Sequence, residues 1–287
     1  MVFHHVVKQK NFDSVFNPAQ GSRSARLTIK LTVELFALDP SLADSPAGGE
    51  HPVHLAQSMT HVRRGLVKDG DDDPIMCRSW LMHEWSAFKT RFKKMVEMSW
   101  NNQMILLPSD EKNSGRSNDH DYRQLISNPR APAHVECALD IDLTSMGQAT
   151  HAEIDVVHLA ETRRPFRSHM RRITDKDVEF ETSHMKKWRD RTIFQVPAAH
   201  EIGYWLRDLN KHHFEHIDKP YAMTLPKADQ DDAEYGHVLG KRVAMMGAGN
   251  LCTAHEARPW LSRIGQHINT VSGWTFLHRI HFRQRYP

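Results

Sequence analysis

The sequence predicts an α+β protein with a mixed sheet. A regular apolar alternation marks a strand at residues 26–38, and an apolar stripe at helical spacing marks a long helix at residues 79–100. Further strands and helices follow along the chain without strict β-α-β alternation. This order favours an α+β fold over a doubly wound parallel sheet.

The first strand and the long helix carry the strongest patterns. In residues 26–38, apolar side chains alternate with polar ones, which is typical of a half-buried strand; they are Leu27, Ile29, Leu31, Val33 and Leu35. In residues 79–100 the apolar stripe is Leu81, Trp85, Phe88, Phe92, Val96 and Trp100. Such a stripe packs in a core far more often than it binds a ligand, and we assign it to the core.

The remaining elements are shorter. We expect strands at 137–143, 152–160, 177–182 and 275–282, where apolar residues alternate or run together. We expect one helix at 197–209, because Pro197 suits the first turn, and another at 259–268. Nothing in the composition marks a domain boundary.

Composition excludes several classes of protein. The 287 residues are 39% hydrophobic and 25% charged with a net charge of +3, typical of a globular protein without a nucleic-acid-binding patch. No apolar run could span a membrane, and the first residues lack the apolar core of a signal peptide. We therefore expect synthesis in the cytoplasm, with Cys77, Cys137 and Cys252 as free core thiols. Export by a machine that reads no signal peptide stays open.

The most informative segment runs from Val196 to Asp218 and reads VPAAHEIGYWLRDLNKHHFEHID. A zinc-binding helix places two histidines at positions i and i+4, so that both imidazoles face one metal ion. A glutamate after the first histidine then acts as general base for water. His200 and Glu201 occupy these two positions, but Tyr204 stands where the pattern requires the second histidine.

The segment PAAHEIGYWL resembles the AHExGHxxG active-site helix of zincin metallopeptidases, in the style of metzincins. The family's glycine and third ligand would fall at Arg207 and Asn210. Together with Tyr204, three defining positions therefore depart from the pattern. MMGAGN at 245–250 resembles the methionine-containing turn that lies beneath a zincin metal site, and a C-terminal helix follows it. DAEYG at 232–236 resembles part of the aspzincin signature and singles out Asp232.

The resemblance implies a single zincin-like domain spanning residues 1–287. Residues 1–175 would form the N-terminal sheet and long helix, and residues 176–287 the active-site helix, the Met turn and the C-terminal helix. The implied site has Glu201 as the catalytic base and zinc held by His200, Tyr204 and Asp232, although an unperturbed phenol with a pKa of about 10 is a poor ligand at neutral pH. Other nearby candidates are His212, His213, His216, Asp218 and His237.

Three functions stay open. The first is a zinc hydrolase with a remodelled site that cuts a peptide or protein substrate. The second is a pseudoenzyme that keeps the fold as an effector or cargo, because similar chains occur among proteins associated with bacterial secretion and contractile injection systems. Such a chain would have a secretion-apparatus partner. The third is an interaction module that was never a peptidase. Nucleotide-binding and α/β-hydrolase motifs are absent, and Cys252 near His255 is the local candidate for a nucleophilic Cys-His pair.

Overall fold

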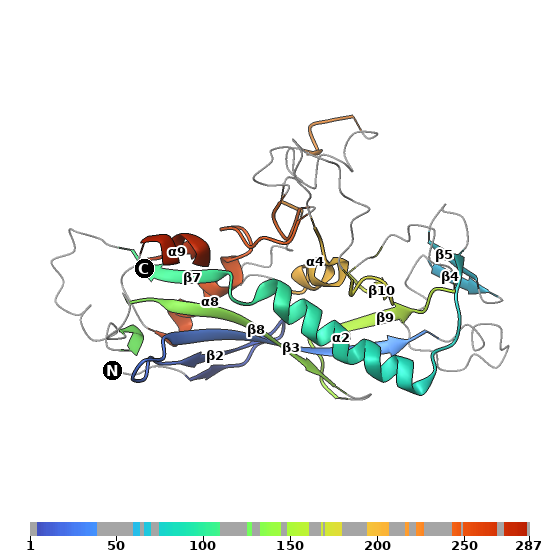
Figure 1. The fold of residues 1–287 in the computed structure, drawn as a ribbon, viewed down its shortest axis with the longest axis horizontal. Helices are drawn as coiled ribbons and strands as arrows, with labels where there is room; N and C mark the ends of the chain where they lie inside the picture. The colour runs from blue at the N-terminus through green and yellow to red at the C-terminus, as the bar shows by residue number, and fades with distance from the viewer. Residues whose placement is uncertain are drawn as a thin grey trace.

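The computed structural model shows a mixed α+β architecture, as the sequence predicts (Figure 1). An eight-stranded sheet with parallel and antiparallel pairs forms one layer, and helices pack on it. The structure describes residues 5–38, 60–63, 66–69, 75–109, 125–127, 133–144, 148–160, 168, 170–179, 194–206, 216–217, 222–226, 243–247, 249–268 and 273–285.

The sheet is organised around the long strand β3 (Ala25–Ala37), which confirms the first predicted strand. Strands β8 (Val135–Leu143) and β9 (Ala152–Val157) both run parallel to β3. Val33 pairs with a residue of each, so β8 and β9 lie on opposite sides of β3. Strand β10 (Arg172–Thr174) then pairs in parallel with β9 at the edge of the sheet.

The other strands pair antiparallel. In the order of strands, β2 (Asp13–Asn17) pairs with β3, and β1 (Val6–Val7) pairs with the other edge of β2. On the other side of β3, β7 (Met104–Pro108) joins β8 to β11 (Trp274–His278). A separate three-stranded sheet consists of β4 (Thr60–Arg63), β5 (Leu66–Asp69) and β6 (Ile75–Met76). None of β1, β2, β4, β5, β6 and β7 was expected from the sequence, because short strands leave little alternation to read.

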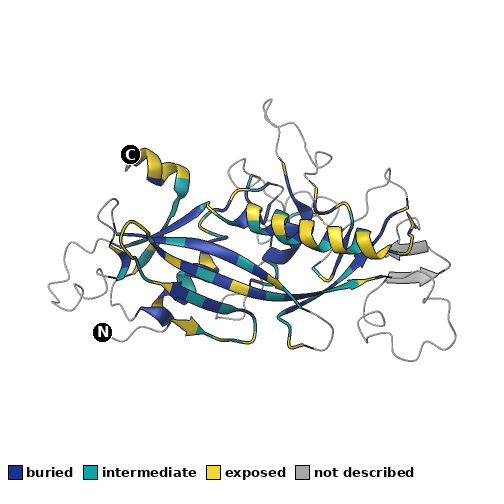
Figure 2. Cartoon of the chain, turned by 60° about the horizontal axis from the view of Figure 1, so that its bottom comes forward, coloured by how far each residue is buried: buried dark blue, intermediate teal, exposed yellow. Residues whose placement is uncertain are grey.

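Burial alternates along β3 as its sequence requires (Figure 2). The side chains on one face are buried, and they are Ala25, Leu27, Ile29, Leu31 and Val33. Those between them are exposed or intermediate, and they are Arg26, Thr28, Lys30 and Thr32. One face of β3 is therefore covered and the other is partly open to solvent.

Helix α2 (Met82–Trp100) confirms the predicted long helix and lies across the sheet (Figure 1). It buries Phe88, Phe92, Val96 and Trp100, whereas Leu81 precedes the helix and is exposed. At its end, Asn102 adopts a left-handed backbone with φ of 62°, a conformation that asparagine tolerates well, and the chain turns into β7.

Side chains of α2 also satisfy the edge of β8 that β7 leaves unpaired, since β7 pairs only with Val135 and Glu136. Asn101 accepts from the Leu139 amide at 2.7 Å and donates to the Leu139 carbonyl at 3.0 Å. Glu97 accepts from the Ile141 amide at 2.9 Å. Edge groups buried without such partners would each cost about 1–3 kcal/mol, so these contacts fix α2 against the sheet.

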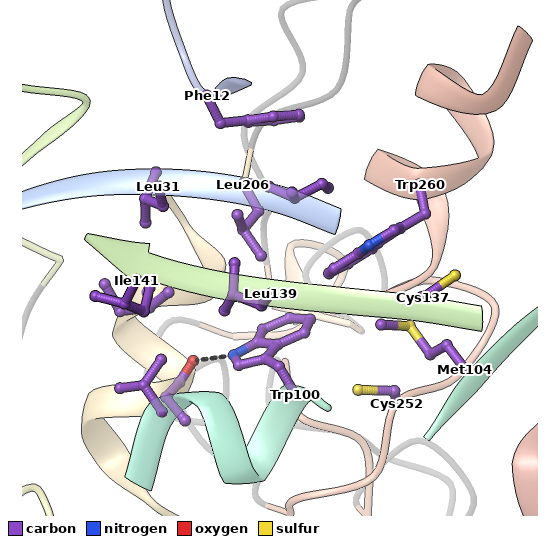
Figure 3. Close-up of a cluster of buried hydrophobic side chains, with 14 of the residues drawn as sticks. Phe12, Leu31, Trp100, Met104, Cys137, Leu139, Ile141, Leu206, Cys252 and Trp260 are labelled. Carbon is purple, nitrogen blue, oxygen red and sulfur yellow. Dashed lines mark hydrogen bonds between the residues drawn. The ribbon is translucent and has the colours of Figure 1, made fainter. Parts of the chain in front are cut away.

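A single hydrophobic core joins residues from Phe12 to Ile268. Figure 3 shows part of it, where Trp100 of α2 lies near Leu139 and Cys137 of β8. Trp100 stacks on Trp260 with ring centroids 6.0 Å apart. Trp260 belongs to α8 (Arg258–His267), which confirms the predicted C-terminal helix. Both halves of the chain therefore contribute to the same core.

Two predicted strands are partly wrong. Residues 177–179 form turns instead of a strand, because the Asp177 carboxylate accepts from the Thr174 amide and closes a turn directly after β10. Residues 279–282 lie in helix α9 (Arg279–Arg285), although 275–278 belong to β11 as expected. The strand ends at His278 because its partner β7 begins at Met104, so no strand is available beyond it.

The predicted strand at 137–143 is confirmed within β8, and two other predicted elements are shorter than expected. Strand β9 ends at Val157 instead of residue 160, and helix α4 (Pro197–Gly203) is shorter than the expected 197–209. Cys77, Cys137 and Cys252 are all free and buried, as expected. Among the described residues, no helix is long and apolar enough to cross a membrane.

His158, directly after β9, ties the parallel strands to the start of α2. It stacks on Trp80 with centroids 4.1 Å apart. Its two ring nitrogens each lie 3.9 Å from a carboxylate oxygen, one of Glu84 and one of Asp175. Burial lowers the pKa of His158 below its ordinary 6.5, assisted by Arg78 and opposed by Asp175 and Glu84. The buried ring is therefore neutral at neutral pH.

We expect this buried histidine to make stability depend on pH. A histidine whose folded pKa is lowered binds fewer protons in the folded than in the unfolded chain, so its contribution is complete above about pH 6.5 and is lost as pH falls through the folded pKa. Urea unfolding between pH 7.5 and 5 should show a smaller acid loss for His158→Gln than for the native chain. The exposed His83→Gln should keep the native slope; equal slopes for all three chains would contradict the assignment.

Candidate functional site

Helix α4 carries the sequence motif and is buried along its whole length. Pro197 occupies the first turn, where its missing N–H is not needed. The indole nitrogen of Trp100 in α2 donates to the Ala199 carbonyl at 3.0 Å, which attaches α4 to the long helix. After Gly203 the chain continues with tighter i to i+3 hydrogen bonds as far as Leu206. The helix that carries His200 is therefore fixed by the core.

The Met turn (245–250) packs directly against α4. A Cβ atom on Gly203 would lie 2.3 Å from Met246 Sδ and 3.2 Å from Trp100, so glycine permits the close approach of the turn to the helix. A Cβ atom on Gly249 would lie 2.1 Å from the Val243 carbonyl oxygen, so only glycine allows the turn to close on itself. The turn and the helix thus fit together at two glycine positions.

The contact between the Met turn and His200 fixes the state of the imidazole. His200 Nδ1 lies 2.7 Å from the Met245 carbonyl oxygen. A carbonyl oxygen can only accept a hydrogen bond, so Nδ1 carries a proton, and in the neutral ring Nε2 then keeps its lone pair. Gln195 Nε2 lies 3.1 Å from the same ring nitrogen and donates to the Gly247 carbonyl at 2.9 Å, which ties the segment before α4 to the turn. His200 Nε2 is therefore the nitrogen available to a ligand.

Tyr204 and His216 meet His200 at this nitrogen. Tyr204 Oη lies 3.1 Å from His200 Nε2 and also makes a short hydrogen bond with His216 Nε2. The two imidazole rings are nearly parallel, with centroids 5.2 Å apart and an interplanar angle of 25°. The tyrosine ring stands almost perpendicular to both, at 85° and 76°. We name these three side chains the His-Tyr-His cluster.

The hydrogen bonds of the cluster are all oriented in the same direction, from His216 through Tyr204 to His200. Because His200 Nε2 has no proton, the Tyr204 hydroxyl donates to it, and Tyr204 Oη in turn accepts from His216 Nε2. The Met245 carbonyl therefore orders the whole chain of hydrogen bonds from one end. Without a metal ion, the phenol oxygen satisfies both imidazoles.

One pair of atoms in the cluster, His200 Nε2 and Tyr204 Oη, has the spacing of two zinc ligands, whereas the contact between Tyr204 Oη and His216 Nε2 is shorter and would have to lengthen around a metal ion. Zinc–nitrogen and zinc–oxygen bonds of about 2.0–2.1 Å in a tetrahedron place neighbouring donor atoms about 3.3 Å apart. The 3.1 Å between His200 Nε2 and Tyr204 Oη is close to that spacing. A histidine that donates Nδ1–H to a backbone carbonyl and presents Nε2 is the usual arrangement of a zinc ligand. Two nitrogens and one oxygen would supply three protein donors.

The predicted site residues have different outcomes. The structure brings His200 and Tyr204 together, adds His216 from the list of alternatives, and buries Glu201 next to His200 in the sequence. Asp232 lies outside the described residues, as do Arg207, Asn210, His212, His213, Asp218 and His237. Within the described part of the chain, no three His, Cys, Asp or Glu side chains gather as a metal site, so only the phenol completes a set of three donors.

The alternative Cys252–His255 pair is not supported. Cys252 is 1% exposed, and burial raises the pKa of its thiol well above the ordinary value. A nucleophilic cysteine requires a thiolate and access for a substrate. Cys252 has neither, and it belongs to the hydrophobic core near Met104 and Cys137 (Figure 3).

Sequence reasoning missed Glu256 and Gln195. Glu256 is fully buried, and its carboxylate accepts from the Met246 amide at 3.0 Å and from the Thr253 amide at 2.8 Å. The His255-Glu256 dipeptide gave no signal, since it lacks a histidine four residues on. Gln195 is an ordinary polar residue before a helix. Only the three-dimensional structure shows that both serve the Met turn.

No protein-family model, no curated protein and no solved structure matches this chain. The assignment of a function therefore depends on the geometry of the His-Tyr-His cluster and on the motif that carries it.

Proposed function

We propose that this chain is a metallopeptidase-like protein with a remodelled zinc site, in which the His-Tyr-His cluster replaces the ordinary set of histidines. One observation carries the proposal: Nε2 of His200 presents its lone pair toward Tyr204 Oη, which also contacts Nε2 of His216. The Met turn against α4 supports it, because the sequence resemblance implies such a turn beneath the metal. Asp232 stays a prediction for a further ligand.

A zinc ion held there would act as a Lewis acid on a carbonyl group of a peptide or protein substrate. Glu201 follows His200 on α4 and is 7% exposed, and we assign it the role of general base, accepting a proton from the attacking water. Delivery through a bacterial secretion system remains part of the proposal on the strength of the sequence resemblance.

A second function is favoured by the same contacts when no metal ion takes part in them. The hydrogen bonds among His200, Tyr204 and His216 are complete without a metal ion, so the phenol can replace zinc as the centre of the cluster. The chain would then be a pseudoenzyme whose cluster stabilises an interaction module. The two functions differ in one measurable property, which is the zinc content.

We expect the purified native protein to bind about one equivalent of zinc, since three correctly oriented donors suffice for a catalytic site. His200→Ala and His216→Ala should each retain less than about a tenth of that zinc, because removal of a ligand typically weakens metal binding by far more than tenfold. Metal content after dialysis, measured by atomic emission, checks this. His83→Ala removes an exposed histidine of α2 and should keep the native zinc content.

The outcomes separate the two functions. Absence of zinc in the native protein, with the same urea midpoint with and without chelator, would contradict the zinc site and favour the interaction module. Zinc together with hydrolysis of denatured casein that Glu201→Gln abolishes would establish the peptidase. Zinc without hydrolysis would leave a metal-binding pseudoenzyme.

A further inference from the structure

The peptide unit between Met245 and Met246 is held from both of its sides. Its carbonyl oxygen, on Met245, accepts from His200 Nδ1 at 2.7 Å. Its N–H group, on Met246, donates to Glu256 Oε1 at 3.0 Å. Because a peptide unit is planar, fixing the N–H direction also fixes the direction of the carbonyl oxygen. Glu256 therefore determines where the acceptor for His200 points.

Glu256 is itself firmly held. Its side chain is fully buried directly before α8, and its second oxygen accepts from the amide and the hydroxyl of Thr253. A carboxylate accepting from three donors in the interior is strongly localised, and hydrogen bonds to a charged acceptor are about twice as strong as neutral ones. The negative charge also polarises the peptide, which strengthens its carbonyl as an acceptor.

From this geometry we infer that Glu256 is a positioning residue of the metal site, acting on His200 through the Met245–Met246 peptide. The carboxylate, the peptide and the imidazole form a relay that holds His200 with its proton on Nδ1 and its lone pair on Nε2. A carboxylate bound directly to a ligating histidine is a common device for setting the tautomer and basicity of the ligand. Here a peptide unit stands between the two groups. The consequence for zinc rests on the proposed function, whereas the consequence for the tautomer does not.

Glu256→Gln tests the relay with little change of shape. The glutamine side chain keeps one acceptor oxygen, but its NH₂ group must face either the Met246 amide or the Thr253 amide. Both of these amides are donors, so one of the two hydrogen bonds to residue 256 is lost. In metal-free protein with chelator, the imidazole ¹⁵N shifts of His200 should show a reduced fraction of the Nδ1–H tautomer. The His200 signal is assigned among the 21 histidines by its loss in His200→Ala. The zinc dissociation constant should rise about 10–100-fold.

Two further variants keep the test decisive. Thr253→Val removes the hydroxyl that donates to Glu256 and accepts from the His255 amide, but it keeps the Thr253 amide donor. It should give a smaller shift in the same direction, so it decides the question if Glu256→Gln does not fold. Glu97→Gln makes the same chemical change at a carboxylate that accepts from the Ile141 amide, far along the chain from the Met turn, and should leave the His200 tautomer native. A folded Glu256→Gln with native tautomer and zinc affinity would overturn the inference.

The two readouts also distinguish this inference from the proposed function. If the native protein binds no zinc but Glu256→Gln still shifts the tautomer, the zinc site fails and the relay stands. If zinc binds and neither readout moves in the folded variants, the relay fails and the zinc site stands.

Discussion

Trp100→Ala is expected to destabilise the protein by about 3–5 kcal/mol, the usual cost of deleting a large buried aromatic side chain. Trp100 is fully buried, stacks on Trp260 of α8 and lies 3.2 Å from the position of a Cβ on Gly203. Its removal would also leave the Ala199 carbonyl of α4 without its indole donor. The free energy of unfolding in urea measures the effect.

Two matched variants separate the contribution of the buried ring from that of its hydrogen bond and from the effect of an exposed substitution on the same helix. Trp100→Phe keeps one six-membered ring but loses the second ring of the indole together with its N–H donor, so beyond the loss of volume the missing hydrogen bond should cost about 1 kcal/mol. Met82→Ala changes a side chain that is 90% exposed on the same helix and should stay within about 0.5 kcal/mol of the native protein. If Trp100→Ala costs no more than Met82→Ala, the packing of α2 against α4 and α8 is wrong.

Tyr204→His is expected to tighten zinc binding by about 100–1000-fold. A phenol with an ordinary pKa near 10 must lose a proton at a cost of about three pH units at neutral pH, whereas an imidazole binds zinc in its neutral form. The backbone of Tyr204 is helical, with φ of −63° and ψ of −23°, so a histidine there would lie one turn beyond His200. Isothermal titration with zinc measures the change.

The matched control for that variant is Tyr204→Phe. It keeps the ring but removes the oxygen that contacts both imidazoles, and zinc affinity should fall below the native value. If Tyr204→His binds zinc no better than Tyr204→Phe, then α4 does not present positions 200 and 204 to one metal ion. That result would contradict both the zincin resemblance and the proposed site.

Long amphipathic elements could be predicted from the sequence because their own periodicity specifies them. Residues 25–37 and 82–100 carry enough regularly spaced apolar side chains to indicate strand and helix without knowledge of their partners. Short elements could not, because their structure depends on what lies beside them. Strand β7 exists because β8 and β11 pair with it, and the antiparallel β11 ends at His278, opposite Met104 where β7 begins.

In the candidate site, the residues within one helical turn could be predicted from the sequence, whereas the residue from a distant segment could not. The motif at 200–204 identified His200, Glu201 and Tyr204, since these positions lie within one helical turn. His216 was one of several histidines in a His-rich segment, and spacing did not distinguish it. Hydrogen-bond geometry at Tyr204 Oη does.

The sequence by itself determined the α+β class, the central strand and the long helix, and it contains a segment that resembles a zinc-binding motif with its second histidine replaced. These features depend on periodicity and on spacing within one element, which the chain carries locally. Only the tertiary structure decided that the Met turn contacts His200, that His216 joins the cluster, and that Glu256 holds the Met245–Met246 peptide. These contacts join residues that are 10, 12 and 45 positions apart, and they form because one buried core brings α4, the Met turn and α8 together.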